Sequence, residues 1–328
     1  MTVRATLVAL LATGAAALTA APADAQTRDY WVAAVPIDWN MVPNERDALG
    51  GTSFTPAETV LPTVVYRRFS RGWMHPERNV GLDGGNQDLI PGPLLRARVG
   101  ERIRVHFKNL DSAFRRPHSM HFHGVHYRPS SDGAYLPGFS GRDADVAYGR
   151  TWTYSLTAGR DSVGVWPYHD HSPSMDASIA GGMYGMLSIL GRHDRVPDRE
   201  FEVVFAAMGP FQTIDGRAFV GDTPVFRSTV GQLVQWDVMA MGSEFHTFHV
   251  HGHRWIGPGG VPRDTQTVGP AETYRIRWRE EDPGTWLYHC HVEAHMEMTG
   301  WYVVEDAKGR ADASPQALVN WICRTRPA

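Results

Sequence analysis

Apolar and polar residues alternate along several short stretches of the chain, and a period of two residues is typical of β-strands. Residues 94–109, LLRARVGERIRVHFKN, alternate on both sides of a Val-Gly-Glu break, which predicts a strand, a turn and a second strand. Residues 201–208, 229–240 and 273–280 show the same alternation. Helical periodicity is almost absent, while 33 glycines and 22 prolines interrupt the sequence. The pattern therefore predicts an all-β fold.

The first 25 residues do not share this pattern. They carry one early positive charge at Arg4, an apolar and alanine-rich stretch from Leu7 to Ala21, and the small residues Ala23-Asp24-Ala25. This arrangement is typical of a secretory signal peptide. A single arginine favours the Sec route over the twin-arginine route, so we expect export to the periplasm or out of the cell. No later segment is apolar for the roughly 18 residues that a membrane span needs.

The rest of the chain contains an internal repeat. HSMHFHG at 118–124 aligns without gaps on HTFHVHG at 246–252, and GVWPYHDH at 164–171 aligns on GTWLYHCH at 284–291. Two short motifs that recur in the same order, with similar separation, imply two homologous domains.

The repeat sets the expected domain boundaries. We predict a first domain over residues 26–193 and a second over 194–306, divided at a charged, proline-containing segment. Residues 38–92 are rich in Pro, Gly and Asn and poorly patterned, so we expect an N-terminal arm with loops that covers the first domain. Residues 307–328 form a polar C-terminal tail without a motif that we can interpret.

Charge and cysteine content exclude some classes of protein. The formal net charge is −3 and no basic run is present, which favours neither a nucleic-acid partner nor a polybasic membrane surface. The chain has 2 cysteines, too few for a disulfide framework. Cys290 lies inside a His-Cys-His triplet, and Cys323 in the polar tail is interpreted as a free thiol.

Histidines are concentrated in the repeated motifs. The repeated motifs contain four His-x-His pairs, and in a strand this spacing points both rings to one face; the pairs are His121/His123, His169/His171, His249/His251 and His289/His291. Cys290 then points to the opposite face, where His246 and His295 are placed to join it. A thiolate, imidazoles and a distant thioether are the ligand set of a blue-copper electron-transfer site. The sequence therefore predicts two neighbouring metal sites that share one strand.

The two domains differ at the thiolate position. The alignment places His118 on His246, Asp170 on Cys290 and Met175 on His295. The first domain thus lacks the thiolate and one imidazole, so only the second domain can hold a blue-copper centre. We interpret His118 as a hydrogen-bonded or surface histidine rather than as a ligand.

These motifs, HFHG, YHDH, HTFHVHGHRW and YHCHVEAH, resemble those of multicopper oxidases, specifically the two-domain small laccases of bacteria. The resemblance implies two cupredoxin-like Greek-key β-barrels and about four coppers per chain: one type 1, one type 2 and two type 3. By position, type 1 copper takes His246, Cys290 and His295, and type 2 takes His121 and His249. One type 3 copper takes His123, His169 and His291, and the other takes His171, His251 and His289.

The axial ligand departs from the family pattern. Similar laccases have methionine five residues after the last type 1 histidine, where this chain has Gly300, and Met298 lies three residues after it. Either the site lacks a thioether, or the loop is two residues shorter and Met298 is the ligand. The repeat favours Met298, because GMYGMLSI matches EMTGWYVV and places Met183 on Met298. The alternative is a methionine that only fills the core.

The resemblance also implies catalytic roles for Tyr127, Asp132 and Asp264. A tyrosine four residues after the second histidine of the first motif lies near the cluster in small laccases, and the two acids match residues implicated in proton delivery and oxygen access. Asp132 could instead be a turn residue before glycine, and Asp264 a solvated loop carboxylate.

The implied function is oxidation of phenolic or other organic reductants, one electron at a time, coupled to reduction of O2 to water at a trinuclear cluster. A cuprous or ferrous oxidase is the main alternative, although no Met-rich insertion is present. Copper nitrite reductases lack the second histidine of His-Cys-His. A copper carrier would leave eight histidines without a role, and structural zinc is normally closed by four ligands. The resemblance further implies a homotrimer with clusters at subunit interfaces.

Overall fold

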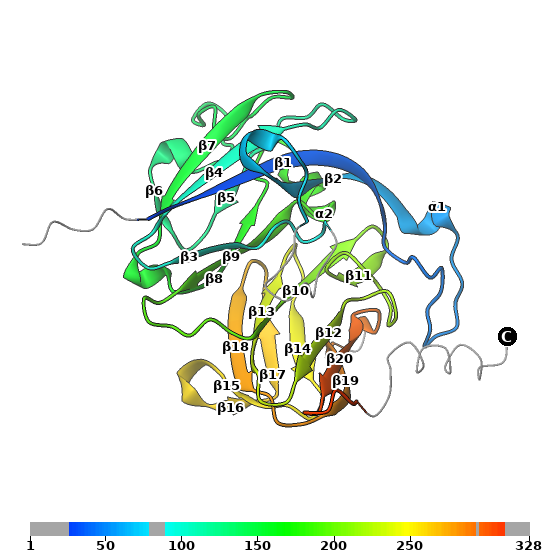
Figure 1. Ribbon diagram of the computed structural model, residues 1–328. Helices are drawn as coiled ribbons and strands as arrows, with labels where there is room; N and C mark the ends of the chain where they lie inside the picture. Colours follow the sequence, from blue (N-terminus) through cyan, green and yellow to red (C-terminus); the bar gives the residue numbers. More distant parts are fainter. Residues whose placement is uncertain (1–25, 79–88, 293–294, 312–328) are drawn as a thin grey trace, which may run out of the picture.

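The computed structural model describes residues 26–78, 89–292 and 295–311. Within them the chain forms two stacked β-domains, and the all-β prediction is confirmed (Figure 1). The predicted signal peptide and Cys323 lie outside the described residues. No helix in the described part of the chain is long and apolar enough to cross a membrane.

The first domain packs a five-stranded sheet on a four-stranded one. The five-stranded sheet has the order β2 (Val60–Phe69), β1 (Thr27–Asn40), β4 (Arg102–Asn109), β7 (Thr151–Thr157) and β6 (His126–Tyr127). The four-stranded sheet has the order β3 (Leu95–Arg98), β9 (Tyr184–Leu190), β8 (Gly164–His169) and β5 (His121–Phe122). Large aromatic side chains fill the space between the sheets, and each contributes roughly 1.5–3 kcal/mol by leaving water; they include Tyr66, Phe107, Phe122, Tyr154 and Tyr168.

The second domain repeats this arrangement. Its four-stranded sheet has the order β11 (Phe211–Ile214), β10 (Arg199–Met208), β13 (Leu233–Ala240) and β18 (Thr273–Arg279). Its five-stranded sheet has the order β12 (Val225–Thr229), β20 (Thr299–Glu305), β19 (Gly284–Cys290), β14 (His246–Val250) and β17 (Thr265–Val268). The hairpin of β15 (Trp255–Ile256) and β16 (Pro262–Arg263) lies beside them. Trp236 is the centre of an aromatic core with Phe201, Phe226, Phe248 and Tyr288.

Helices are short. Among the described residues the α-helices are α1 (Pro56–Thr59) and α2 (Met175–Ala180), and single 3-10 turns occur at Arg71–Trp73, Pro129–Ser131, Arg160–Ser162 and Pro258–Gly260. Of these, α2 matters most for the site, because it follows the YHDH motif directly.

All four predicted stretches of alternation form strands. Residues 94–109 give β3 and β4, with Gly100 at φ +95 in the turn between them, but the two strands enter different sheets. The other three stretches coincide with β10, with β12 and β13, and with β18.

The prediction for residues 38–92 was wrong in two respects. Residues 60–69 form β2, which pairs with β1 over ten positions. Alternation is missing there because Val64 and Tyr66 enter the first core, while Val65 enters an apolar cluster shared by both domains. The segment between β1 and β2 also packs on the second domain (Figure 1): Asn44 N donates to Asp222 Oδ1 at 3.1 Å, and the ring of Phe54 lies 5.3 Å from the rings of Phe211 and Phe219.

The two domains are joined by polar contacts as well as by this apolar cluster. Arg275 on β18 donates to the carbonyl oxygens of Gly164 and Ile189 at 2.7 and 2.9 Å. Arg96 in the first domain forms an ion pair with buried Glu200 at 2.6 Å. Because these partners are buried or partly buried, they fix the relative orientation of the domains.

Candidate metal centre

The internal repeat is reproduced in backbone hydrogen bonds. Asp170 N donates to Met183 O at 3.0 Å, and Cys290 N donates to Met298 O at 3.0 Å. Gly124 and Gly252 each lie against a tryptophan at φ +69 and +74, where a Cβ would approach the indole to 1.9 and 2.8 Å. The repeated motifs therefore have the same local backbone conformation in both domains.

Cys290, His246 and His295 converge inside the second domain. The sulfur Sγ of Cys290 lies 3.6 Å from Nδ1 of His295 and 3.8 Å from Nδ1 of His246. All three side chains are buried, and their ligand atoms lie within 4.8 Å of one another. Burial, and then the neighbouring His295, lower the pKa of His246 to about 4, so the ring is neutral and free to bind a metal. One thiolate and two imidazoles suit copper.

Met298 lies in the same buried apolar cluster as Cys290 and is fully buried. The position five residues after His295 is closed to a long side chain, because a Cβ on Gly300 would lie 2.4 Å from the ring of Tyr288. Met296 is 61% exposed. These observations favour the shorter loop, with Met298 as the axial donor.

The eight remaining predicted ligands form two groups of four. In the first domain His121, His123, His169 and His171 have ring centroids 5.0–5.6 Å apart. In the second domain His249, His251, His289 and His291 have centroids 5.1–5.6 Å apart. Each group comes from two adjacent antiparallel strands, since His121 pairs with His169 and His249 with His289.

Backbone carbonyls set the orientation of four of these rings. Nδ1 of His121 lies 2.6 Å from Asp132 O, and Nδ1 of His249 lies 2.7 Å from Asp264 O. Likewise His169 and His289 direct Nδ1 to the carbonyls of Asp170 and Cys290 at 2.9 and 2.8 Å. Because a carbonyl only accepts, Nδ1 carries the proton and Nε2 is left for a metal.

Burial makes the rings poor bases. Burial, followed by the neighbouring histidines, lowers the pKa of His123 to about 4. Burial also lowers the pKa of His169 to about 4 and, to a smaller extent, the pKa values of His251 and His289. Neutral imidazoles at close range, with Nε2 atoms 3.3 and 3.1 Å apart in the pairs His123/His169 and His251/His289, are suited to hold metal ions.

The two groups of four are not brought together. Within residues 26–78, 89–292 and 295–311, no hydrogen bond or ring contact joins a histidine of one group to a histidine of the other. One chain therefore presents two separate half-sites, one on each domain.

Tyr127 and Asp132 lie beside the first half-site. The ring of Tyr127 is 6.4 Å from that of His121, and an oxygen of Asp132 is 3.5 Å from His121 Nδ1. Burial, with Asp132 as the next cause, raises the pKa of Tyr127 to about 12. Asp264 serves the second half-site through its carbonyl, and its carboxylate accepts a hydrogen bond from Thr265 at 3.2 Å.

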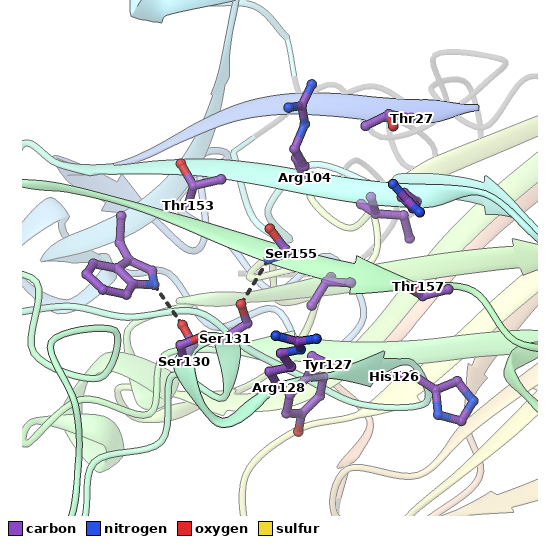
Figure 2. A pocket seen from close by; sticks show the side chains of 14 residues that line it. Thr27, Arg104, His126, Tyr127, Arg128, Ser130, Ser131, Thr153, Ser155 and Thr157 are labelled. Atoms are coloured by element: carbon purple, nitrogen blue, oxygen red, sulfur yellow. Dashed lines mark hydrogen bonds between the residues drawn. The ribbon is translucent and has the colours of Figure 1, made fainter. Parts of the chain in front are cut away.

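Tyr127 also joins two surface pockets. A pocket of about 600 Å³ lies over β4, β7 and β6 and is lined by Arg104, Arg128, Ser155 and Tyr127 (Figure 2). A second pocket of about 380 Å³ contains Tyr127, His121 and His123. The phenol side chain therefore stands where solvent approaches the first half-site.

Glu244 was not found by sequence reasoning. One of its oxygens lies 3.4 Å from Nε2 of His295, and Gln212 donates to the same oxygen at 2.8 Å. Glu244 also lines a cavity of about 520 Å³ between the domains, with Met175 and Asp176 on one side and Met241 on the other. A carboxylate in a loop two residues before His246 has no distinctive spacing, so no pattern could have indicated it.

Comparison with known proteins agrees with this site. Multicopper oxidase family models match residues 81–194 and 195–308. The chain is 28% identical to human ferroxidase HEPHL1 over 362 residues, which cover 86% of this chain but 30% of the relative. It therefore spans about a third of the length of that relative.

Solved structures show the same fold. A multicopper oxidase crystal structure superposes with a TM-score of 0.63 at 23% identity, covering 85% of this chain and 89% of the other. A copper nitrite reductase from Nitrosomonas europaea gives 0.62 at 17% identity, covering 89% and 96%. At these identities the likeness shows the predicted cupredoxin fold. With two family models matched over consecutive domains and the thiolate and imidazole ligands in place, the chain belongs to the multicopper oxidase family.

Proposed function

We propose that the protein is a laccase-type oxidase that takes single electrons from phenolic or other organic reductants and reduces O2 to water. The observation that carries this proposal is the position of Cys290 on β19. Its thiolate faces His246 and His295, while the adjacent His289 and His291 belong to a group of four imidazoles. When bound, type 1 copper would supply one-electron acceptance, and together with a trinuclear copper cluster it would supply the four electrons that O2 needs.

The protein contributes a fixed connection between the two ligand sets. Cys290 is covalently joined to both His289 and His291, and its own carbonyl accepts the Nδ1 proton of His289 at 2.8 Å. The connection is therefore short and rigid, and the histidine tautomer does not depend on solvent.

Glu244 is the proposed contact for the reductant. A phenol loses its proton when it loses an electron, and a carboxylate 3.4 Å from Nε2 of His295 can accept that proton. The adjoining cavity of about 520 Å³ is within the size range of small-molecule sites and is partly lined by apolar side chains.

The same carboxylate supports a second candidate, a cuprous or ferrous oxidase. Glu244 and Asp176 line one cavity with Met175 and Met241, a set that suits a metal ion as reductant. The ferroxidase relative points the same way. We rank this function second because most of the residues that line the cavity are apolar and the sequence carries no Met-rich insertion.

Tyr127, Asp132 and Asp264 are proposed to support the cluster. Tyr127 and Asp132 are placed to pass protons from the outer pocket toward His121. Asp264 holds His249 by its carbonyl, and its exposed carboxylate is available to accept a proton from solvent and pass it on at the matching position of the second domain.

We further propose that the cluster forms between chains. Each chain offers two separate half-sites, and a head-to-tail ring pairs the first domain of one chain with the second domain of the next. A homotrimer of this kind would hold three clusters. On the signal-peptide prediction, we place the enzyme in the periplasm or outside the cell.

Oxygen uptake tests the function. Copper-loaded protein should consume O2 with a substituted phenol at a higher kcat/KM than with Cu(I) or Fe(II), measured in parallel. Higher kcat/KM with a metal ion would favour the second candidate. Anaerobic reduction of nitrite without O2 consumption would contradict both.

A further inference from the structure

Asp170 occupies, in the first domain, the place of the copper-binding thiolate in the second. Thr247 N donates to Cys290 Sγ at 3.4 Å, and the equivalent Ser119 N donates to Asp170 Oδ1 at 2.7 Å. The carboxylate is fully buried. The first domain has therefore kept the local backbone of the type 1 site while exchanging the sulfur for oxygen.

His118 takes the place of the type 1 ligand His246. Its Nδ1 lies 3.3 Å from Asp170 Oδ2, and its Nε2 lies 3.2 Å from Asp111 Oδ2. Both ring nitrogens therefore face a carboxylate oxygen, and the His118 ring bridges the two acids. The matching nitrogen of His246, Nε2, has no hydrogen-bond partner. We define Asp111, His118 and Asp170 as the ion triplet.

The ion triplet is fully satisfied. Asp111 accepts from the backbone N–H groups of Phe114 and Arg116 at 2.9 and 3.1 Å. Asp170 accepts from the Ser172 hydroxyl at 2.8 Å. A buried ion group that lost one member would leave an uncompensated charge, which is strongly destabilising.

This group is directly connected to the first half-site. Asp170 lies in sequence between His169 and His171, and its carbonyl holds His169 Nδ1. The backbone N–H of Ser119 donates to the Asp170 carboxylate. The Ser119 hydroxyl in turn accepts a hydrogen bond from the backbone N–H of His171 at 3.1 Å. The ion triplet therefore links β5 to the end of β8. The four histidines of the first half-site lie on these two strands or just after them.

We propose that the ion triplet is a metal-free counterpart of the type 1 centre, and that Asp170 and His118 are positioning residues for the first half of the copper cluster. The inference rests on the proposed trinuclear cluster. The His118 ring links Asp111, beyond the end of β4, to Asp170, beyond the end of β8, so the first half-site keeps its geometry without a metal of its own.

The test uses copper-loaded, full-length Asp170→Asn and His118→Gln, with Asp145→Asn as a control at an exposed carboxylate of the same domain. The readouts are copper per chain, the type 1 absorption and potential, and the type 2 EPR signal. We expect the type 1 band and potential to be unchanged, because that site lies in the other domain. Copper affinity of the cluster should fall about 10- to 100-fold, with an altered type 2 signal. Full cluster loading with a wild-type EPR signal in both variants would overturn the proposal.

A rescue variant separates positioning from folding. Met175 N donates to Ser172 O at 3.0 Å as His295 N donates to Val292 O at 2.8 Å, so Met175 stands where the second type 1 imidazole would stand. The double variant Asp170→Cys/Met175→His should bind copper beside His118, add a second thiolate band and restore cluster loading relative to Asp170→Asn. A second thiolate band without restored loading would contradict a positioning role. If the cluster proposal itself is wrong, the wild-type protein will already bind only type 1 copper.

Discussion

Cys290 is the residue on which most of the chemistry depends. It is the only cysteine among the described residues, and it is buried. The histidines before and after it point to the opposite face of the strand. Because side chains alternate along a strand, one residue separates two metal environments. Individual substitutions on this short segment can therefore affect one centre and spare the other.

The first prediction follows from the thiolate. Copper-loaded wild-type protein should show an intense blue thiolate-to-Cu(II) band, and Cys290→Ser should abolish it, because the hydroxyl is a hard and weak ligand. Copper retained by Cys290→Ser should correspond to the cluster alone. Absorption spectra and copper analysis check this, and a blue Cys290→Ser protein would refute the type 1 assignment.

The axial ligand can be tested separately. Met298→Leu should raise the type 1 potential, because loss of a weak thioether donor destabilises Cu(II) relative to Cu(I). Met296→Leu is the matched control, since this methionine is 61% exposed. Redox titration of the blue band measures the change. An unchanged potential and spectrum in Met298→Leu would mean that the site has no methionine ligand.

Glu244→Gln tests electron entry. Losing the proton acceptor should lower kcat/KM for phenols roughly tenfold or more, and leave the type 1 band in place. Glu281→Gln, at an exposed glutamate away from the cavity, should behave like wild type. Steady-state oxygen uptake decides the matter, and equal rates in both variants would place reductant binding elsewhere.

At the scale of elements, β19 and β20 explain the short axial loop. Gly300 pairs with Tyr288, and its missing side chain leaves room for the phenol ring; Gly185 and Tyr168 repeat this pair in the first domain. The loop must therefore complete its turn before Gly300. This agrees with the proposal that Met298, three residues after His295, is the axial ligand.

A stability prediction belongs to this element. Gly300→Ala places a Cβ 2.4 Å from the Tyr288 ring, so repacking should cost about 1–3 kcal/mol of unfolding free energy. Glu305→Ala at the end of the same strand should cost much less, since its side chain is only partly buried. Urea denaturation of both variants provides the comparison, and equal midpoints would show that the strand pair can relax.

The sequence predicted some elements much better than others, for physical reasons. Strands with one face in the core, such as β4 and β18, alternate and were found. Strand β2 was missed because Thr63 to Tyr66 are buried on both faces. The histidine pairs were found because their spacing matches the strand period. The carbonyl contacts of Asp132 and Asp264 depend on loop conformation, and nothing in the residue pattern encodes them.

At the scale of the whole molecule, the proposed assembly of chains follows from the separation of the two half-sites. Each holds four imidazoles with ring centroids 5.0–5.6 Å apart, and no described contact joins them within one chain. The contacts of Arg275 and Arg96 hold the domains in one orientation. We therefore propose that a second copy of the chain completes each cluster.

Subunit mixing tests the central claim most directly. The variants His121→Ala/His123→Ala and His249→Ala/His251→Ala should each be inactive alone, because each lacks half of every cluster. After equal mixing with proven subunit exchange, about one quarter of the interfaces in a head-to-tail ring should pair an intact first domain with an intact second domain. Oxygen uptake should therefore recover to about one quarter of the wild-type rate. No recovery despite exchange, or full activity in a wild-type monomer, would contradict a cluster shared between chains.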